Sequence, residues 1–455
     1  MNIFKVPVLI WGVLLVWTGL YFCGIFLYSG STLMFNVFSF VYLALLLSGI
    51  CYKVTYGYMF FVIMLWLGFW LKIVVHLLSG SAFVEPIGYF DSSESSWDNV
   101  LLVASIGALG VISGRVIFHI LFGLHSTMTN NTEYSPPNWY SQHKLVIWLL
   151  FIFCVVVFSV LNSIYSFQQV GIVPKTIIWP LNTVFYWLLT TGFTMTAVTL
   201  MWWEFVSGKN KNTIYFVVFE SAMSSVSLLS RGVYIFNLVP VLAAVFLNRK
   251  KIYGFSYRWF LFLFFVFILV FCVCYPLVNA ARDYYYSSVP FAMPVSLYSG
   301  GVFQKFFLKM TTFSVDRWVG VEGLMATSAY PEKGISLFFS VLTEKGEIGK
   351  LSIFQDIALS HYRYLDTSRF SFASLPGPIS FYYLSGSLLV VMFGMALMAL
   401  LILMSEVLVY RMLRNPLLAA FWGGGCLRRS VRWVLIFMGL FCILFCALLG
   451  FCFCI

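Results

Sequence analysis

The chain has 455 residues, of which 61% are hydrophobic, 20% aromatic and only 9% charged. Soluble globular domains carry about a quarter charged residues, so this composition excludes a soluble globular protein and indicates an integral membrane protein. The formal net charge of +11 gathers in basic clusters beside apolar stretches, where such residues meet anionic lipid; nothing in the pattern indicates nucleic-acid binding.

Apolar runs of about twenty residues match an α-helix crossing about 30 Å of hydrocarbon, and the short alternating segments of an outer-membrane barrel are absent from the sequence. We therefore predict an all-α, polytopic protein of a bacterial inner membrane with about eleven transmembrane helices. The first span lacks a small-residue cleavage site and is predicted to be a retained anchor. The predicted spans are Val8–Leu27, Thr32–Cys51, Tyr56–Leu78, Val100–Leu121, Leu145–Tyr165, Thr176–Phe205, Thr213–Leu229, Val233–Leu247, Phe255–Val278, Ile379–Val409 and Val434–Cys454.

One large polar block interrupts this pattern between Asn279 and Gly377. The chain thus divides into residues 1–278 with the first nine spans, a loop of residues 279–377, and residues 378–455 with the last two spans. In a chain that is otherwise almost entirely apolar, we expect this polar block to carry the functional site.

Orientation follows from the lysines and arginines of the short connections. With a cytoplasmic N-terminus, the cytoplasmic segments hold fourteen of them and the opposite short connections hold only Lys175 and Arg231. This bias predicts a cytoplasmic N-terminus and a periplasmic loop. The fourteen are Lys5, Lys53, Lys144, Lys209, Lys211, Arg249, Lys250, Lys251, Arg258, Arg411, Arg414, Arg428, Arg429 and Arg432.

Several ionisable residues fall inside predicted spans, where a charge is costly and often marks function. Lys72 and His76 share a helix face near the outer end of the third span; they could meet an anionic lipid headgroup, or Lys72 could extend along the helix to the surface. For Arg115, near the cytoplasmic end of the fourth span, we expect such extension. Glu220 lies mid-span beside a run of serines, and is either a hydrogen-bonded structural acid or a residue lining a polar cavity.

The sharpest local signal is Ser230-Arg231-Gly232, which joins two short apolar segments. A turn this tight would place Arg231 at the periplasmic surface of the membrane, where a guanidinium can bind phosphate oxygens through two hydrogen bonds. The alternative is an arginine that only binds lipid phosphate.

The loop supplies the other candidates. Asp316, Gly320 and Gly323 would share one stripe of a helix, and the two glycines would let a backbone or a bulky ligand come close; Glu322 points to another face. His361, Arg363 and Arg369 lie among aromatic residues, a combination that suits sugar stacking with diphosphate contact or an ordinary surface cluster. Phe303–Leu308 and Ile335–Leu342 are predicted amphipathic helices on the membrane surface.

This plan resembles the Wzy-type polymerases of O-antigen and other repeat-unit polysaccharides, and the related O-antigen ligases. The resemblance rests on the many spans, the Ser-Arg-Gly turn, the single large loop with arginines before the last spans, and the run Leu375-Pro-Gly-Pro-Ile379 with Tyr382-Tyr383-Leu-Ser-Gly386-Ser. The resemblance extends from about Leu145 to about Leu403, and its motifs are short.

The resemblance implies a GT-C-like membrane glycosyltransferase that uses undecaprenyl-diphosphate-linked oligosaccharide, with no metal and no cofactor. Chain-length regulator and flippase proteins would be its partners, besides membrane lipids. The implied catalytic candidates are Asp316, Glu322 and His361, one of which would be the general base; the substrate-binding candidates are Arg231, Arg282, Arg317, Arg363 and Lys72. A ligase-like transferase and a flippase for lipid-linked sugar remain alternatives.

Overall fold

The computed structural model describes residues 8–50, 55–123, 136–173, 180–207, 211–248, 257–286, 315, 318, 320–344, 350–364, 366, 368–371, 374 and 376–429. Over these residues the regular structure is helical, mostly α-helical, apart from two strands of two residues each. Seven of the described helical segments are long and apolar enough to cross a membrane, and three more are apolar but shorter. The chain is therefore an all-α, multi-pass membrane protein, as predicted. The predicted span Val434–Cys454 lies outside the described residues.

The described helices overlap the predicted spans, although Glu94–Phe122 and Asn138–Tyr165 begin six and seven residues before the predicted starts. Two of the spans contain a π-helical turn, a rare feature that often occurs at functional sites. These turns are η2 (Trp66–Leu71), between α3 (Tyr56–Leu65) and α4 (Lys72–Ser79), and η3 (Leu188–Gly192), between α7 (Leu181–Trp187) and α8 (Phe193–Val206). The others are α1 (Val8–Leu27), α2 (Thr32–Ile50), α5 (Glu94–Phe122), α6 (Asn138–Tyr165), α9 (Ile214–Ser227), α10 (Arg231–Leu247), α11 (Tyr257–Tyr286) and α17 (Leu388–Leu413).

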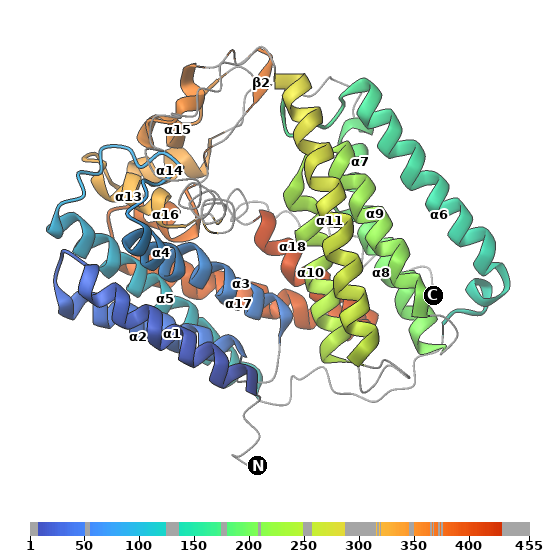
Figure 1. The fold of residues 1–455 in the computed structure, drawn as a ribbon, viewed down its shortest axis with the longest axis horizontal. Helices are drawn as coiled ribbons and strands as arrows, with labels where there is room; N and C mark the ends of the chain where they lie inside the picture. The colour runs from blue at the N-terminus through green and yellow to red at the C-terminus, as the bar shows by residue number, and fades with distance from the viewer. Residues whose placement is uncertain are drawn as a thin grey trace.

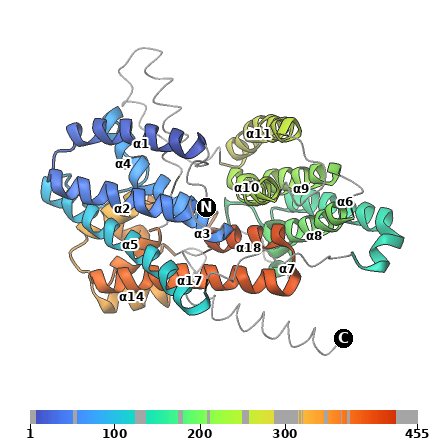
Figure 2. The ribbon, with the colours of Figure 1, turned by 90° about the horizontal axis from the view of Figure 1, so that it is seen from below.

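The helices form two groups, each with its own core (Figure 1). The first group joins α1–α5 and α17 to three short helices, α13 (Val321–Ala329), α15 (Ile353–Ile357) and α16 (Pro378–Tyr383). The second joins α6–α11 to α18 (Pro416–Arg429). Seen from below, α3 of the first group and α18 of the second lie side by side where the two groups meet (Figure 2).

Helices α5 and α17 pack backbone against backbone in the first group. A Cβ atom added at Gly110 would overlap the Met392 carbonyl, and one at Gly114 would overlap the Ala396 carbonyl. Small residues allow such close contact between membrane helices, whose association depends on van der Waals packing. The glycines of α5 thus allow α17 to pack directly against the backbone of α5.

The two groups contact each other at the N-terminus of α3. The Glu406 carboxylate of α17 accepts hydrogen bonds from the backbone N–H groups of Tyr56 and Gly57, both at 2.6 Å, and so satisfies two of the free donors of a helix start. Gly423 of α18 packs against Gly57, and the Asn248 amide after α10 donates to the Tyr56 hydroxyl at 2.6 Å. Four helices meet at this point.

Two sequence predictions are wrong here. Ile379–Val409 is not one span, because the helix breaks between α16 and α17, where Gly386 has φ +72°. The stretch after α17, predicted to be a connection, contains helix α18, whose Leu417, Leu418 and Phe421 are buried in the second core. In addition, α11 continues past Val278 to Tyr286, so the predicted first loop residues are helical.

The loop reaches both groups. Its α13 is buried in the first core, while β2 (Phe370–Ser371) pairs antiparallel with β1 (Gly171–Ile172), in the connection between α6 and α7. The predicted helix Ile335–Leu342 is confirmed as α14, which exposes Ile335 and Phe339; its location on the membrane surface stays a prediction. We call the end of the molecule that carries α13–α16 and the two strands the loop end. The predicted helix Phe303–Leu308 lies outside the described residues.

Candidate functional site

The turn between α9 and α10 is built by serines. The Ser225 hydroxyl donates to the Ser230 carbonyl at 2.8 Å, and the Ser230 N–H donates to the Ser225 carbonyl at 2.9 Å. Leu229 takes a left-handed conformation with φ +53°, which lets the chain reverse within three residues. Arg231 is then the first residue of α10, so the predicted tight turn is confirmed, while the position of Arg231 at the membrane surface stays a prediction.

Arg282 joins Arg231 at this turn. The Nε of Arg282, from the last turns of α11, donates to the Leu229 carbonyl at 2.8 Å. The Nη1 of Arg231 donates to the Tyr275 hydroxyl at 3.3 Å, and its guanidinium lies 5.2 Å from the Tyr275 ring centroid. We call Arg231 and Arg282 the arginine pair; both side chains are half-buried, and both are held by neutral groups in these contacts.

The strands bring the loop to the same turn. The Val170 N–H donates to the Leu228 carbonyl at 3.0 Å, and the Val173 N–H donates to the Arg369 carbonyl at 3.1 Å. Between these two contacts lies the pairing of β1 with β2. Three parts of the chain, the α6–α7 connection, the α9–α10 turn and the loop around Arg369, therefore converge at the loop end.

The end of α6 is fixed to the end of α9 by Asn162. Its buried amide donates to the Ser227 carbonyl at 2.9 Å and to the Gln168 carbonyl at 3.0 Å, while its oxygen accepts from the Gln168 N–H at 2.7 Å. A buried amide that satisfies three backbone groups defines one arrangement of the segments it joins. This contact holds the α6–α7 connection beside the arginine pair.

Glu220 is fully buried in α9 and accepts three hydroxyl hydrogen bonds. The donors are Thr194 at 3.0 Å, Ser224 at 3.0 Å and Ser221 at 3.2 Å. The Asn237 amide of α10 donates in turn to the Thr194 hydroxyl at 2.8 Å. These contacts match the hydrogen-bonded structural acid, one of the two alternatives left open by the sequence, and they join α8, α9 and α10.

Lys72 and Glu322, which the sequence places 250 residues apart, form an ion pair. Lys72 is completely buried and Glu322 is 3% exposed; the lysine also donates to the Trp318 carbonyl at 2.9 Å. Lys72 therefore neither extends to the membrane surface nor lies exposed to a lipid headgroup. Burial raises the pKa of the Glu322 carboxyl, and the positive charge of Lys72 opposes that shift.

The structure brings none of the remaining loop candidates that it describes into the contacts reported above. His361 begins the 3₁₀ helix η6 (His361–Tyr364) with an exposed side chain, and the backbone of Arg363 belongs to the same helix. Asp316 and Arg317 lie outside the described residues. Of the predicted helix through residues 316–323, Val321–Gly323 belong to α13, whereas Trp318 and Gly320 do not lie in a helix. The predicted close approach of a backbone at Gly320 and Gly323 is confirmed by contacts with Gly68 and Pro376.

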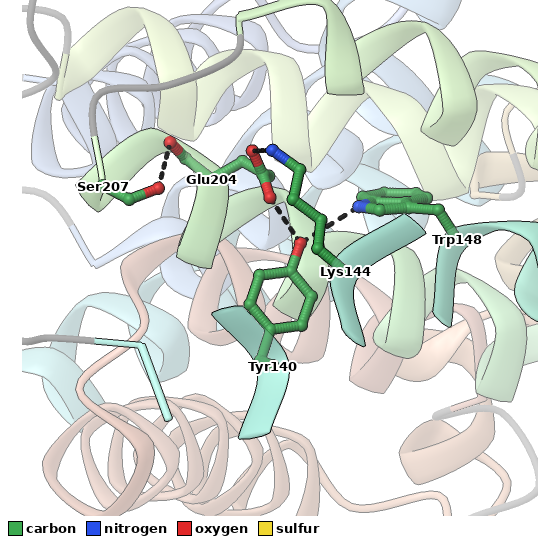
Figure 3. A network of polar contacts seen from close by, with 5 residues as sticks. All are labelled: Tyr140, Lys144, Trp148, Glu204 and Ser207. Atoms are coloured by element: carbon green, nitrogen blue, oxygen red, sulfur yellow. Dashed lines mark hydrogen bonds and ion pairs between the residues drawn. The ribbon is translucent and has the colours of Figure 1, made fainter. Parts of the chain in front are cut away.

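A further buried carboxylate, Glu204, joins the end of α8 to the start of α6, away from the loop end; Figure 3 shows its contacts. Glu204 of α8 accepts from the Tyr140 hydroxyl at 2.6 Å and from Lys144 at 2.5 Å, both in α6. The Trp148 indole donates to the Tyr140 hydroxyl at 3.0 Å. Glu204 is 1% exposed, so this network joins two helices and does not form an open site.

Tyr275 and the β1 segment were not among the sequence candidates. Tyr275 lies in an aromatic-rich span, where nothing separates a tyrosine that holds an arginine from one that faces lipid. Gly171 and Ile172 form a strand only because Ser371 and Phe370 pair with them, 200 and 198 residues further along the chain, and a pairing over this distance leaves no local signal.

The chain shows no significant match to a protein-family model, to a curated protein or to a solved structure.

Proposed function

We propose that this chain is a membrane glycosyltransferase that polymerises undecaprenyl-diphosphate-linked oligosaccharide repeat units. In this proposal the loop end faces the periplasm of a bacterial inner membrane, and the arginine pair binds the diphosphate of the lipid-linked donor. The observation that carries the proposal is the arrangement of Arg231 and Arg282 around one turn, next to the loop strand β2.

The geometry of the pair suits a diphosphate. Guanidinium groups bind phosphate oxygens through paired, charge-assisted hydrogen bonds. Contacts with Tyr275 and the Leu229 carbonyl restrain the two side chains, so less conformational entropy is lost when a ligand binds. Donors that are already in place also stabilise the charge that develops on a leaving group.

The chemistry requires few protein groups. A sugar hydroxyl of the acceptor attacks the anomeric carbon of the donor, the bond from that carbon to the diphosphate oxygen breaks, and the diphosphate leaves with the electron pair. A general base takes the hydroxyl proton. Of the candidates Asp316, Glu322 and His361, the last has an exposed side chain that a bulky glycan can reach, whereas Glu322 is enclosed with Lys72.

The decisive experiment uses the purified protein in detergent with lipid-linked oligosaccharide and no nucleotide, ion gradient or added metal. A ladder of longer glycans on the lipid is the expected result. A flippase would leave the glycan unchanged, and a ligase-like transferase would need a separate lipid acceptor and would make no ladder. Either of these outcomes overturns the polymerase proposal.

A further inference from the structure

Lys72 follows directly after the π-helical turn η2 of its span. At this turn the helix backbone is uncovered at Gly68, and a Cβ atom added at Gly320 of the loop would overlap the Gly68 carbonyl. The loop therefore touches the membrane helix without a side chain between the two backbones. One turn of helix further on, Lys72 binds the loop at Trp318 and Glu322.

The loop segment is held on its other side by α16. The Ser380 hydroxyl donates to the Gly323 carbonyl at 2.7 Å and lies 2.6 Å from the Thr327 hydroxyl. Val321, Leu324 and Met325 are fully buried in the first core. This part of the loop is thus packed into the helical group instead of lying above it.

Both charged groups are enclosed by protein, and each faces the other. Opposite charges at this degree of burial are tolerated because they neutralise one another, and removing one leaves the other buried without compensation. A substrate contact would need at least one of the two groups to be reachable from outside. Their burial points instead to a role between the helix and the loop.

We propose that Lys72 and Glu322 are positioning residues: their ion pair fixes the loop segment Trp318–Thr327 on η2, and neither residue contacts substrate or accepts the reaction's proton. For its activity readout this inference rests on the proposed polymerase function. Its structural readout, the attachment of the loop, does not depend on any activity.

The test compares Lys72→Met, Glu322→Gln and the double variant carrying both. Each single variant removes the opposite charge from a buried charged group and is expected to speed protease cleavage of the loop roughly tenfold, whereas the neutral pair of the double variant should recover most of the protection. Polymerisation should follow the same order, with the loss in kcat and not in KM. Lys72→Arg, which keeps the charge, should retain more protection than Lys72→Met.

Two matched controls remove the same charges from exposed positions of the loop, Lys350→Met and Asp356→Asn, and should leave cleavage unchanged. Gel filtration in detergent reports whether each variant is folded. A double variant as inactive and as easily cleaved as the worse single variant would overturn the proposal, and so would single variants with normal cleavage. If the wild-type protein makes no polymer, the proposed function fails, while the cleavage series still decides whether the pair holds the loop.

Discussion

At the residue scale, the first prediction concerns the guanidinium group of Arg231. Lysine in its place keeps the charge but cannot make two parallel hydrogen bonds to a phosphate. Arg231→Lys should therefore lower kcat/KM at least tenfold, which corresponds to about 1.4 kcal/mol of transition-state stabilisation, with normal amounts of folded protein. The measurement is glycan lengthening by purified protein.

The matched control is Arg258→Lys, because Arg258 is exposed near the start of α11, at the end away from the arginine pair. It should be fully active. If Arg231→Lys polymerises as well as the parent, Arg231 only anchors the helix end to lipid phosphate, and the diphosphate must bind elsewhere.

A second prediction follows from the raised pKa of the Glu322 carboxyl. A carboxyl whose folded pKa lies above its unfolded value binds its proton more tightly in the folded state, so folding weakens as pH rises through that range. Lys72 opposes this effect and Glu85 adds to it; His76 lies one turn from Lys72. Lys72→Met removes the opposing charge.

The loop of Lys72→Met should consequently be better protected from protease at pH 6 than at pH 8, relative to the wild type at the same pH. In the double variant with Glu322→Gln this pH dependence should vanish, because position 322 no longer titrates. Equal protection of Lys72→Met at both pH values would show that Glu322 does not govern the attachment of the loop.

Buried charges were the residues on which sequence reasoning was least informative. The expectation that Arg115 extends to the membrane surface is wrong: it is 5% exposed, binds the Ser48 carbonyl and lies 4.6 Å from the Tyr58 ring centroid. A spacing of four residues shows that two side chains share a helix face, but it does not show whether that face meets lipid or protein. Only the packing of α2 and α3 decides this for Arg115.

At the element scale, hydropathy predicted helices well and their breaks poorly. The bounds of α1 agree with the predicted span, because a continuous apolar run has one solution in a membrane. The break after α16 is different, since Leu384-Ser-Gly-Ser is apolar enough to be averaged into the surrounding run. Helix α18 was missed because its three consecutive glycines resemble a connection, whereas here Gly423 allows close packing on Gly57.

A third prediction tests the network that joins α6 and α8. Glu204→Gln keeps a hydrogen-bond acceptor for Tyr140 but loses the charged contact with Lys144, and a hydrogen bond to a charged group contributes about 1.5–3 kcal/mol. The variant should unfold at a lower temperature in detergent. Its kcat/KM should be unchanged, because the network lies at the end opposite the arginine pair.

Glu204→Leu serves as the second point of this series. It leaves the Tyr140 hydroxyl and Lys144 without their acceptor and should be less stable than Glu204→Gln. A loss of polymerisation with unchanged unfolding temperature would contradict the structural role assigned to this carboxylate.

At the scale of the whole molecule, the loop links two helical groups that have separate cores. It is attached to the first through α13 and the Lys72–Glu322 pair, and to the second through β1 and β2. The sequence predicted the two ends of this arrangement, the arginine turn and the large loop, since both have local signals. Their connection depends on contacts between distant residues, which composition and periodicity do not encode.

The last prediction concerns the orientation of the molecule, on which the proposed function depends. The sequence counts Arg428, Arg429 and Arg432 as cytoplasmic, but the structure makes Arg428 and Arg429 the end of helix α18, so a stricter count leaves these three arginines out. Without these three, eleven basic residues still oppose Lys175 and Arg231. The rule that positive residues stay inside therefore still predicts that the loop end lies outside the cytoplasm.

Reporter fusions measure this directly. Alkaline phosphatase, which folds only outside the cytoplasm, should be active when fused after Lys333 and inactive after Lys250; a fluorescent protein that folds only inside should give the opposite pattern. The arginine pair and Lys333 belong to the loop end, whereas Asn248 lies at the opposite end of α10, so one pair of fusions reports both faces. Phosphatase activity at Lys250 with none at Lys333 would place the arginine pair in the cytoplasm, where a donor waiting in the outer leaflet could not reach it.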